Sequence, residues 1–567
     1  MKVVGYGDRL SVAAGERIEF KVSCQESRYE ATLVQPSHIE ELRRELDAPL
    51  NGSHDGRVQS FPSGSYAQID GPVPRGEELE LELWVCPTAP DSGAQELIAW
   101  DDGTGLFLVD GKVELRAAEA SLACEEPLRR GEWYRVLATV RDGRARVGQR
   151  PLHWGREASV EGALPVQVGE GALRIGRGFD GKIDSPRIAG VAAWDFSLGI
   201  RSQRVFDTGP QGLHGRLVNM PMRGVTGWNW TGRSLDYQRA PEEYGAIHFH
   251  HDDMSDAEWA TDFHLDVPED LASGLYCVRL RAGGEEDQIP FFVRPRRGVA
   301  GARIAFLAPT FSYLAYSCET TGTKTSPAIP EEERLRMEEA LAPGDHYAAE
   351  HGLLSLYDHH ADGTGNCFVS RRRPIPNMRP YYRSVPIWGA HQLGADLHVL
   401  DWLRSLDEPF DVITDEDLHH EGLDLVTRYK AILTGTHPEY WSAPMLDAVG
   451  LYLQDGGRFM YLGGNGMYWV TDPHPDAPHV VEVRRGQSGT RAWQSAPGEC
   501  VQQSTGEQGA CGATAAGRRT RCSASAWPRT ATTTRSRTSA APTASTSASR
   551  GSSLGSTRRS RSAISEP

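Results

Sequence analysis

The sequence has no long apolar run, and this absence excludes a helical membrane span. No stretch of its 567 residues approaches the ~20 consecutive apolar residues that cross a bilayer as a helix. The N-terminal segment alternates polar and apolar side chains, without the basic start and apolar centre of a secretory signal. We therefore expect a cytoplasmic protein with no membrane partner.

Paired cysteines and clustered positive charge are also missing. The nine cysteines are scattered, and none are spaced two residues apart as in a zinc knuckle or a redox motif, so we expect reduced and mostly buried thiols. A formal net charge of -16 argues against nucleic acid, because binding to phosphates selects for clustered Lys and Arg. Small neutral substrates remain open.

The last residues of the chain contain no lysine and few large apolar side chains. Residues 510–567 contain ten Arg, no Lys and one acidic residue, which gives +9 and leaves -25 for the rest. Such a segment, otherwise mostly Ser, Thr and Ala, buries too little apolar surface to fold. Back-translation of ACGATAAGRR, read one nucleotide earlier, gives a globular sequence. We therefore predict a disordered tail made by out-of-frame translation, an incomplete preceding domain and impaired folding or activity. Sequencing the gene across the codons for Gln508 to Cys511 tests this.

The rest of the chain is long and apolar enough for roughly three to four domains. Ile18, Phe20 and Val22 alternate with charged neighbours, as in a strand with one buried face. Residues 276–280 repeat this alternation. We therefore assign residues 1–60 and 200–300 to one β-sandwich built from two segments.

Residues 61–199 contain short strands separated by turns, including a predicted hairpin that turns at Asp110-Gly111. This spacing predicts a jelly roll. The phrases FPSGSYAQIDGP, ELELWV, RRGEWYRVLATVRDG and RIGRGFDGKIDSPRIAG resemble the laminin-G or concanavalin-like lectin fold. Such modules bind sugars or serve as packing and assembly elements, and both roles remain open.

From residue 301 to 509 the pattern changes to apolar runs separated by helices. RIAFLAP, FDVITDEDL, YKAILTG and RFMYLGG are typical of buried parallel strands. Between the last two, we expect a helix capped by Ser442, with Met445, Val449 and Tyr452 on one face. The sequence thus predicts a multidomain β plus α/β protein, whose doubly wound parallel sheet carries chemistry beyond the carboxyl ends of its strands.

Two segments follow these strands closely enough to carry chemistry. GTHPEYWS places His437, Glu439 and Tyr440 within four residues, and a phenolate is a hard oxygen ligand suited to trivalent iron. The alternative is a capping loop with packed aromatics. In GGNGMYWV, Asn465 offers a side-chain amide, or the glycines make only a tight turn.

Two further clusters of His and acidic residues have simpler interpretations. TDEDLHHEG, residues 414–422, fits a helix start capped by Thr414. In AIHFHHDD, His248 and His250 share a strand face within the β part, so we expect packing there and no metal site.

The run SVPIWGAHQLGADLHVLDWL (residues 384–403), followed by FDVITDEDLH, LTGTHPEYWS, YLGGNGMYWVT and VEVRRGQSGTRAW, resembles the large (beta) subunit family of N,N-dimethylformamidase. The resemblance extends over residues 1–509. It implies a mononuclear Fe3+ site held by two tyrosine phenolates and one glutamate, in an incomplete glutamine-amidotransferase-like or flavodoxin-like domain. It also implies a small second subunit in a hetero-oligomer.

Carried onto this sequence, the resemblance implies Tyr440 as one iron ligand. Tyr382 is our choice for the second tyrosine, with Tyr313 as the alternative, and Glu507 is our choice for the carboxylate, with Glu499 in reserve. The implied reaction is hydrolysis of N,N-dimethylformamide, or a related small N-substituted amide, to formate and dimethylamine. In it, His437 protonates the leaving nitrogen and Asn465 assists.

Two other functions remain as alternatives. The first is a lectin-like binding or assembly protein with a catalytically dead α/β domain. The second is a glutamine-amidotransferase-like hydrolase, which needs a cysteine at a strand-to-helix turn. The nearest cysteine, Cys367, lies in a Gly-rich loop, which argues against this second function.

Overall fold

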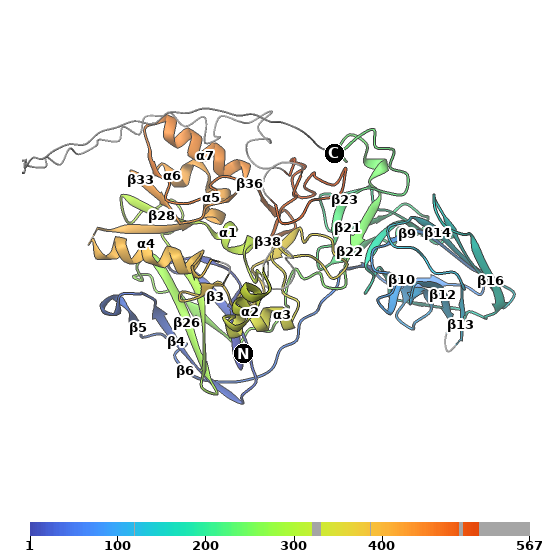
Figure 1. Cartoon of the computed structure of the whole chain (residues 1–567), viewed down its shortest axis with the longest axis horizontal. Helices are drawn as coiled ribbons and strands as arrows, with labels where there is room; N and C mark the ends of the chain where they lie inside the picture. The colour runs from blue at the N-terminus through green and yellow to red at the C-terminus, as the bar shows by residue number, and fades with distance from the viewer. Residues whose placement is uncertain (118–119, 320–329, 386, 407, 487–490, 510–567) are drawn as a thin grey trace, which may run out of the picture.

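The structure is a computed structural model that describes residues 1–117, 120–319, 330–385, 387–406, 408–486 and 491–509. The predicted out-of-frame tail lies outside these residues. Within them, no helix combines the length and apolar character that would be needed to cross a membrane. Sheets dominate the molecule, and the helices gather around one part of it (Figure 1). The prediction of a β-rich multidomain protein is confirmed.

The start of the chain and residues 263–294 together form two mostly antiparallel sheets. One layer has the order β1-β3-β25 and the other β2-β27-β26-β4-β5, in which only the β2–β27 pair is parallel. Ile18, Phe20 and Val22 are all buried between them, as their alternation predicts. The strands are β1 (Val3–Gly7), β2 (Ser11–Ala13), β3 (Arg17–Cys24), β4 (Arg28–Gln35), β5 (Arg44–Leu46), β6 (Gly52–Asp55), β25 (Phe263–Asp266), β26 (Gly274–Ala282) and β27 (Glu285–Arg294).

The central part of the chain forms one continuous sheet of 16 strands, drawn on the right of Figure 1. The hairpin at Asp110-Gly111 is confirmed, since residues 105–109 pair with residues 112–116 around it. The strands are β7 (Tyr66–Ile69), β9 (Leu79–Pro87), β10 (Ala94–Trp100), β11 (Gly105–Val109), β12 (Lys112–Ala117), β13 (Ala120–Ala123), β14 (Tyr134–Arg141), β15 (Arg144–Pro151), β16 (Ala158–Ala163), β18 (Leu173–Ile175), β19 (Gly181–Ile188), β20 (Ala192–Asp195), β21 (Arg204–Asp207), β22 (Gly215–Val218), β23 (Met222–Val225) and β24 (Ala246–Phe249).

The sheet extends beyond the boundary that the sequence placed at residue 199. Strands β21 to β24 all belong to it, with β22 pairing β7 and β24 pairing β19. Residues 204–249 were assigned from sequence to the β-sandwich, and that assignment differs from the observed pairing. The reason is that a strand's partner is set by long-range register, which alternation along one segment does not reveal.

A four-stranded parallel sheet with the order β32-β28-β33-β35 carries the helices of the second half of the chain. Its strands are β28 (Ile304–Ala308), β32 (Phe410–Thr414), β33 (Ala431–Thr434) and β35 (Arg458–Met460). The helices are α1 (Thr310–Ala315), α2 (Glu331–Glu339), α3 (Pro343–Glu350), α4 (Leu393–Ser405), α5 (Asp415–Glu421), α6 (Leu423–Val426) and α7 (Ala443–Gln454).

The remaining strands form small sheets of two or three strands. A three-stranded sheet has the order β29-β38-β37, and β34 pairs with β36. The elements are β8 (Val73–Arg75), β17 (Gly169–Gly171), β29 (Phe368–Ser370), β30 (Arg383–Ser384), β31 (Gly389–Ala390), β34 (Tyr440–Trp441), β36 (Trp469–Val470), β37 (Asp472–His474), β38 (Ala477–Glu482) and the 3-10 turns Glu40–Leu42 and Pro241–Glu243.

Local predictions for two helices are largely confirmed. Thr414 caps α5, accepting a hydrogen bond from the Asp417 N–H, so TDEDLHHEG is a helix start. Helix α7 buries Met445, Val449 and Tyr452 as predicted. The capping bond of Ser442 was predicted wrongly: Ser442 holds the N-cap position, but its Oγ lies 2.8 Å from His419 Nδ1 and caps no N–H of α7.

Candidate functional site

A cluster of oxygen atoms forms at the carboxyl ends of two neighbouring parallel strands. Tyr316 lies one residue beyond α1, which follows β28, and Glu439 lies in the loop that follows β33. Tyr357 comes from the segment after α3. Its hydroxyl and that of Tyr316 both donate to Glu439 Oε2, at 3.1 and 2.7 Å, and the two hydroxyls lie 2.7 Å apart. Three oxygens from distant parts of the sequence thus converge.

Two residues of the HPEYW phrase flank this oxygen cluster. His437 Nε2 lies 3.2 Å from the Tyr316 hydroxyl and 3.1 Å from Glu439 Oε2. Tyr440 donates from its hydroxyl to that of Tyr357 at 2.7 Å and accepts from Arg485 Nη2 at 2.9 Å. The hydrogen-bonded cluster therefore extends from the partly exposed His437 to the buried guanidinium of Arg485.

Backbone contacts hold the HPEYW loop in place. Ser312 Oγ, on α1, accepts from the N–H groups of Glu439 and Tyr440, at 2.9 and 3.3 Å. From the other side, the N–H groups of Tyr468 and Trp469 donate to the Glu439 carbonyl, at 2.8 and 3.0 Å. A helix start and a glycine-rich loop therefore fix the same short segment.

Burial sets the protonation of the cluster. It raises the pKa of the Tyr316, Tyr357 and Tyr440 phenols, and the Tyr440 phenol and the Glu439 carboxylate raise those of Tyr316 and Tyr357 further. Nearby Arg485 works in the opposite direction, favouring phenolate. The phenols are consequently neutral at pH 7 unless a cation joins them.

Arg485 is enclosed by aromatic rings. Its guanidinium lies 4.6 Å from the ring centres of Tyr357 and Trp469 and 5.5 Å from that of Trp493. A planar cation stacks on such faces. Arg485 therefore connects the segments that carry Tyr357 and Tyr440 to the region after β38.

The residues predicted from sequence fall into two groups. His437 and Tyr440 lie at the cluster. Tyr382 instead donates to Asp345 Oδ1 at 2.8 Å, and the alternative Tyr313 donates to Asp396. Asn465 is exposed in a turn at φ +50°, and the loop around it supports the HPEYW backbone.

The two predicted carboxylates lie in the segment after β38. Glu499 is buried against Lys182 of the large sheet and against Thr226, which directly follows β23. The Thr226 Oγ1 donates to the Glu499 carboxylate at 2.8 Å. Glu507 is half-buried, and its backbone carbonyl accepts from the Gln502 N–H at 2.8 Å. The carboxylate that meets two phenols is that of Glu439.

Sequence reasoning missed Tyr316, Tyr357 and Arg485, and noted Glu439 only as a potential donor. A usable signal existed for Tyr316, because APTFSYLAYS follows a parallel strand and contains it three residues after Tyr313. Tyr357 lies in an irregular segment between α3 and β29, where no periodic pattern marks it. Its place at the cluster is a result of the tertiary fold.

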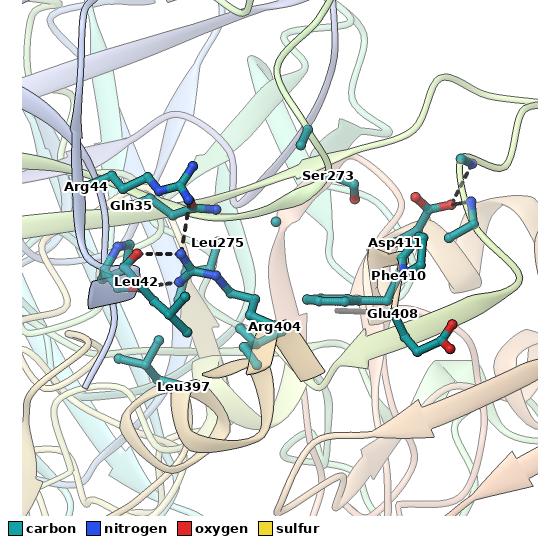
Figure 2. Close-up of a pocket in the computed structure, with 17 residues that line it drawn as sticks. Gln35, Leu42, Arg44, Ser273, Leu275, Leu397, Arg404, Glu408, Phe410 and Asp411 are labelled. Atoms are coloured by element: carbon teal, nitrogen blue, oxygen red, sulfur yellow. Dashed lines mark hydrogen bonds between the residues drawn. The ribbon is translucent and has the colours of Figure 1, made fainter. Parts of the chain in front are cut away.

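A separate cavity of about 540 Å³ opens at the other end of the parallel strands, beside their amino ends. Figure 2 shows Arg404 reaching toward Gln35 and Leu42 on one wall, with Asp411 on the other. These charged groups already have partners, since the N–H groups of Gly301 and Ala302 donate to Asp411 Oδ2. Ligands of open parallel sheets bind beyond the carboxyl ends, and this cavity lies at the amino ends.

The second half of the chain, which carries the cluster, matches a known family model. Residues 222–545 match the family model "N,N-dimethylformamidase beta subunit-like, C-terminal". The N,N-dimethylformamidase beta subunit of Paracoccus aminophilus is 35% identical, over 90% of this chain and 77% of its own. That of an Alcaligenes species is 35% identical, over 89% and 76%.

Among solved structures, domains LG4-5 of the mouse laminin alpha1 chain overlap 30% of this chain and 50% of their own. The identity is 16% and the TM-score 0.18, too low to carry an argument about fold. The sequence matches carry the assignment: the chain belongs to the N,N-dimethylformamidase beta subunit family.

Proposed function

We propose that this protein is the large subunit of an iron-dependent amide hydrolase that cleaves N,N-dimethylformamide, or a related small N-substituted amide, to formate and dimethylamine. The observation that carries the proposal is the convergence of the Tyr316 and Tyr357 hydroxyls on one carboxylate oxygen of Glu439. The names of the two relatives support the substrate class.

The donor set fits a ferric ion. Phenolate and carboxylate oxygens are hard anionic ligands. Three anionic oxygens within 3.1 Å of one another repel strongly, so ionised Tyr316, Tyr357 and Glu439 need a cation between them. We therefore assign these three residues as the ligands, in place of the set Tyr440, Tyr382 and Glu507 expected from sequence. Tyr440 and Arg485 then orient the Tyr357 phenolate through hydrogen bonds.

The rest of the chemistry belongs to the residues around this set. A bound ferric ion supplies Lewis acidity to polarise the amide carbonyl or activate water. His437 lies beside Tyr316 and Glu439 with its side chain 17% exposed, where it can deliver a proton to the leaving nitrogen. Burial lowers the pKa of nearby His391 to about 4, so this imidazole stays neutral beside the His437 ring.

The finer architecture belongs to the same proposal. We propose that the large sheet is a laminin-G or concanavalin-like module and that the parallel sheet is part of a doubly wound domain. The relatives are named beta subunits, which supports a hetero-oligomer with a small subunit. Cytoplasmic location and the lack of a nucleic-acid partner stay predictions.

Iron content and conservative tyrosine variants test the function directly. We expect about one iron per purified chain, a phenolate-to-iron absorption band and release of formate from N,N-dimethylformamide. Tyr316→Phe, Tyr357→Phe and Glu439→Gln should each lose iron and at least ~100-fold in activity, because each removes an anionic ligand.

Tyr382→Phe and Glu507→Gln are the matched controls and should keep iron and the band. Tyr440→Phe should keep iron but shift the band, because it removes no proposed ligand and only the hydrogen bonds that join Tyr357 to Arg485 through Tyr440. Iron retained in Tyr316→Phe and lost in Tyr382→Phe would contradict the ligand assignment. Retention of saccharides by a folded, iron-free chain would instead support the lectin-like alternative.

A further inference from the structure

A second cluster of metal-ligating side chains lies between the large sheet and the segment that follows Tyr357. His248 belongs to β24 and His250 follows that strand, so both project from one face with ring centres 4.2 Å apart. The segment after Tyr357 brings Asp362 to them. Its Oδ2 lies 3.5 Å from His248 Nε2 and 3.6 Å from His250 Nε2. The sequence had indicated only strand packing here.

Among the described residues, several polar atoms of this cluster are buried without a hydrogen-bond partner, whereas His250 Nε2 lies 3.0 Å from Thr364 Oγ1. His248 and His250 are each 3% exposed, and the Asp362 side chain is fully buried. Within the described residues, both ring nitrogens of His248 and the Oδ2 of Asp362 lack a hydrogen-bond partner. Leaving such groups desolvated and unpaired costs on the order of 1–3 kcal/mol each. A bound cation would satisfy the Nε2 of His248 and the Oδ2 of Asp362 together.

Neighbouring groups orient these atoms as they do in metal sites. Thr364 donates to Asp362 Oδ1 from its N–H at 2.8 Å and from its hydroxyl at 2.6 Å, which leaves Oδ2 facing the histidines. On the far side of the His250 ring, Nδ1 lies 3.4 Å from Asp253 Oδ2, itself held by the Ser65 hydroxyl at 2.6 Å. A carboxylate behind a histidine fixes its tautomer and directs the other nitrogen at a metal.

We propose that His248, His250 and Asp362 bind one divalent first-row transition-metal ion, zinc by the chemistry of the donors, separate from the iron. Two imidazole nitrogens and one carboxylate oxygen suit zinc, with water completing the site. A second grouping, His250 with Asp253 and His360, fits less well. The His250 and His360 rings are stacked 3.8 Å apart and nearly parallel, so their in-plane lone pairs do not meet at one point.

The role of this ion is structural. Burial of all three ligands leaves no open face for a substrate. Asp362 lies five residues after Tyr357, so an ion held between it and β24 anchors the segment that carries Tyr357. This consequence for Tyr357 rests on the proposed function, whereas the binding of the ion does not.

Metal analysis of the full chain tests the proposal. After dialysis against chelator and addition of Zn2+, the wild type should hold one zinc per chain. His248→Gln and Asp362→Asn should each weaken zinc binding at least ~10-fold, because each removes a ligand. His251→Gln is the matched control, since His251 pairs with Asp180 at 2.7 Å and should leave zinc binding unchanged. Tyr316→Phe should lose iron and keep zinc, which separates this site from the catalytic one.

Cobalt substitution keeps the test independent of the variants' folding. Co2+ added to folded wild-type protein should give a visible spectrum of a nitrogen-and-oxygen site that Zn2+ abolishes. If the folded wild type shows neither this spectrum nor zinc above the level of His248→Gln, the proposal is overturned. The cluster is then an ion-paired histidine network only.

Discussion

Glu439 Oε2 accepts hydrogen bonds from the Tyr316 and Tyr357 hydroxyls. Whether the two phenols are protonated decides whether the three oxygens can bind a cation. In the neutral form, the phenols donate their protons to the carboxylate and the cluster is a closed hydrogen-bond network. Binding a cation through the same oxygens releases those protons. Iron affinity should therefore rise with pH, because burial raises the pKa of both phenols.

Away from the cluster, His419 gives a prediction about pH and stability. Burial, with neighbouring His420, lowers the pKa of His419 to about 4, from about 6.5 in an unfolded chain. Between these values the unfolded state binds a proton that the folded state does not. Stability is therefore fully present above pH 6.5 and falls as the pH drops toward 4.

Replacing His419 by a side chain that does not ionise should weaken the dependence of stability on pH. His419→Gln should show a decrease in Tm from pH 7 to pH 5 that is about 2 °C smaller than in wild type, a value discounted for partial exposure of the ring. His264→Gln, on an exposed histidine, is the control and should follow wild type. Equal decreases in all three proteins would show that His419 ionises alike in both states.

At the scale of elements, the sequence predicts what is local and misses what is long-range. The α5 cap, the α7 stripe and the hairpin at Asp110-Gly111 depend on spacing within one segment, and all three are confirmed. Residues 204–249 were assigned to the wrong sheet because strand partners lie up to 150 residues away. In the same way, His437 and Glu439 are recognisable together in the HPEYW phrase. Tyr357 is distant in sequence, and only the tertiary fold brings it next to them.

The loop after β35 gives a prediction at this scale. Gly463 packs against the HPEYW loop so closely that an added Cβ would lie 2.4 Å from Pro438 Cδ and 2.6 Å from the Thr436 carbonyl. Gly463→Ala must displace this backbone and with it Glu439. We expect at least ~10-fold loss of iron-dependent activity, because small misplacements of reacting groups cost this much or more.

Gly464→Ala is the matched control, since its nearest neighbour, His437 Nδ1, would lie 3.9 Å from the new Cβ. Formate release and iron content of the two variants, compared at equal protein concentration, check the expectation. Full activity in Gly463→Ala would mean that the two loops separate without moving the ligands. In that case the Ser312 hydrogen bonds and the pairing of β34 with β36 hold the loop.

On the scale of the whole molecule, the end of the described chain is built into the core. The N–H groups of Gln503 and Ser504 donate to Glu482 at 3.0 and 2.8 Å, and Lys182 of the large sheet pairs with Glu499. This segment also leads directly from Arg485 at the site. Residues 482–486 and 491–509 therefore link the large sheet to the small sheet that contains β38 and to the site.

The parallel sheet, by contrast, has an exposed edge. Strand β35 ends the order β32-β28-β33-β35, and within the described residues nothing pairs with its outer side. Met460, Tyr461 and Leu462 are 49%, 42% and 40% exposed there. An open edge with exposed apolar side chains promotes association between chains. That residues 510–567 stand in place of further strands stays a prediction, because these residues lie outside the described part.

Restoring the reading frame after Gln508 should cover this edge. Hydrogen exchange of a peptide spanning residues 458–462 should slow at least ~10-fold in the frame-restored chain, since paired amides exchange only on opening. Residues of β16, at the far end of the large sheet, are the internal control and should exchange at the same rate in both chains. Both chains are compared without the small subunit, so that added strands are the sole difference. Equal exchange at residues 458–462, or a gene without an insertion or deletion at this point, would mean that the edge is a genuine surface of the protein.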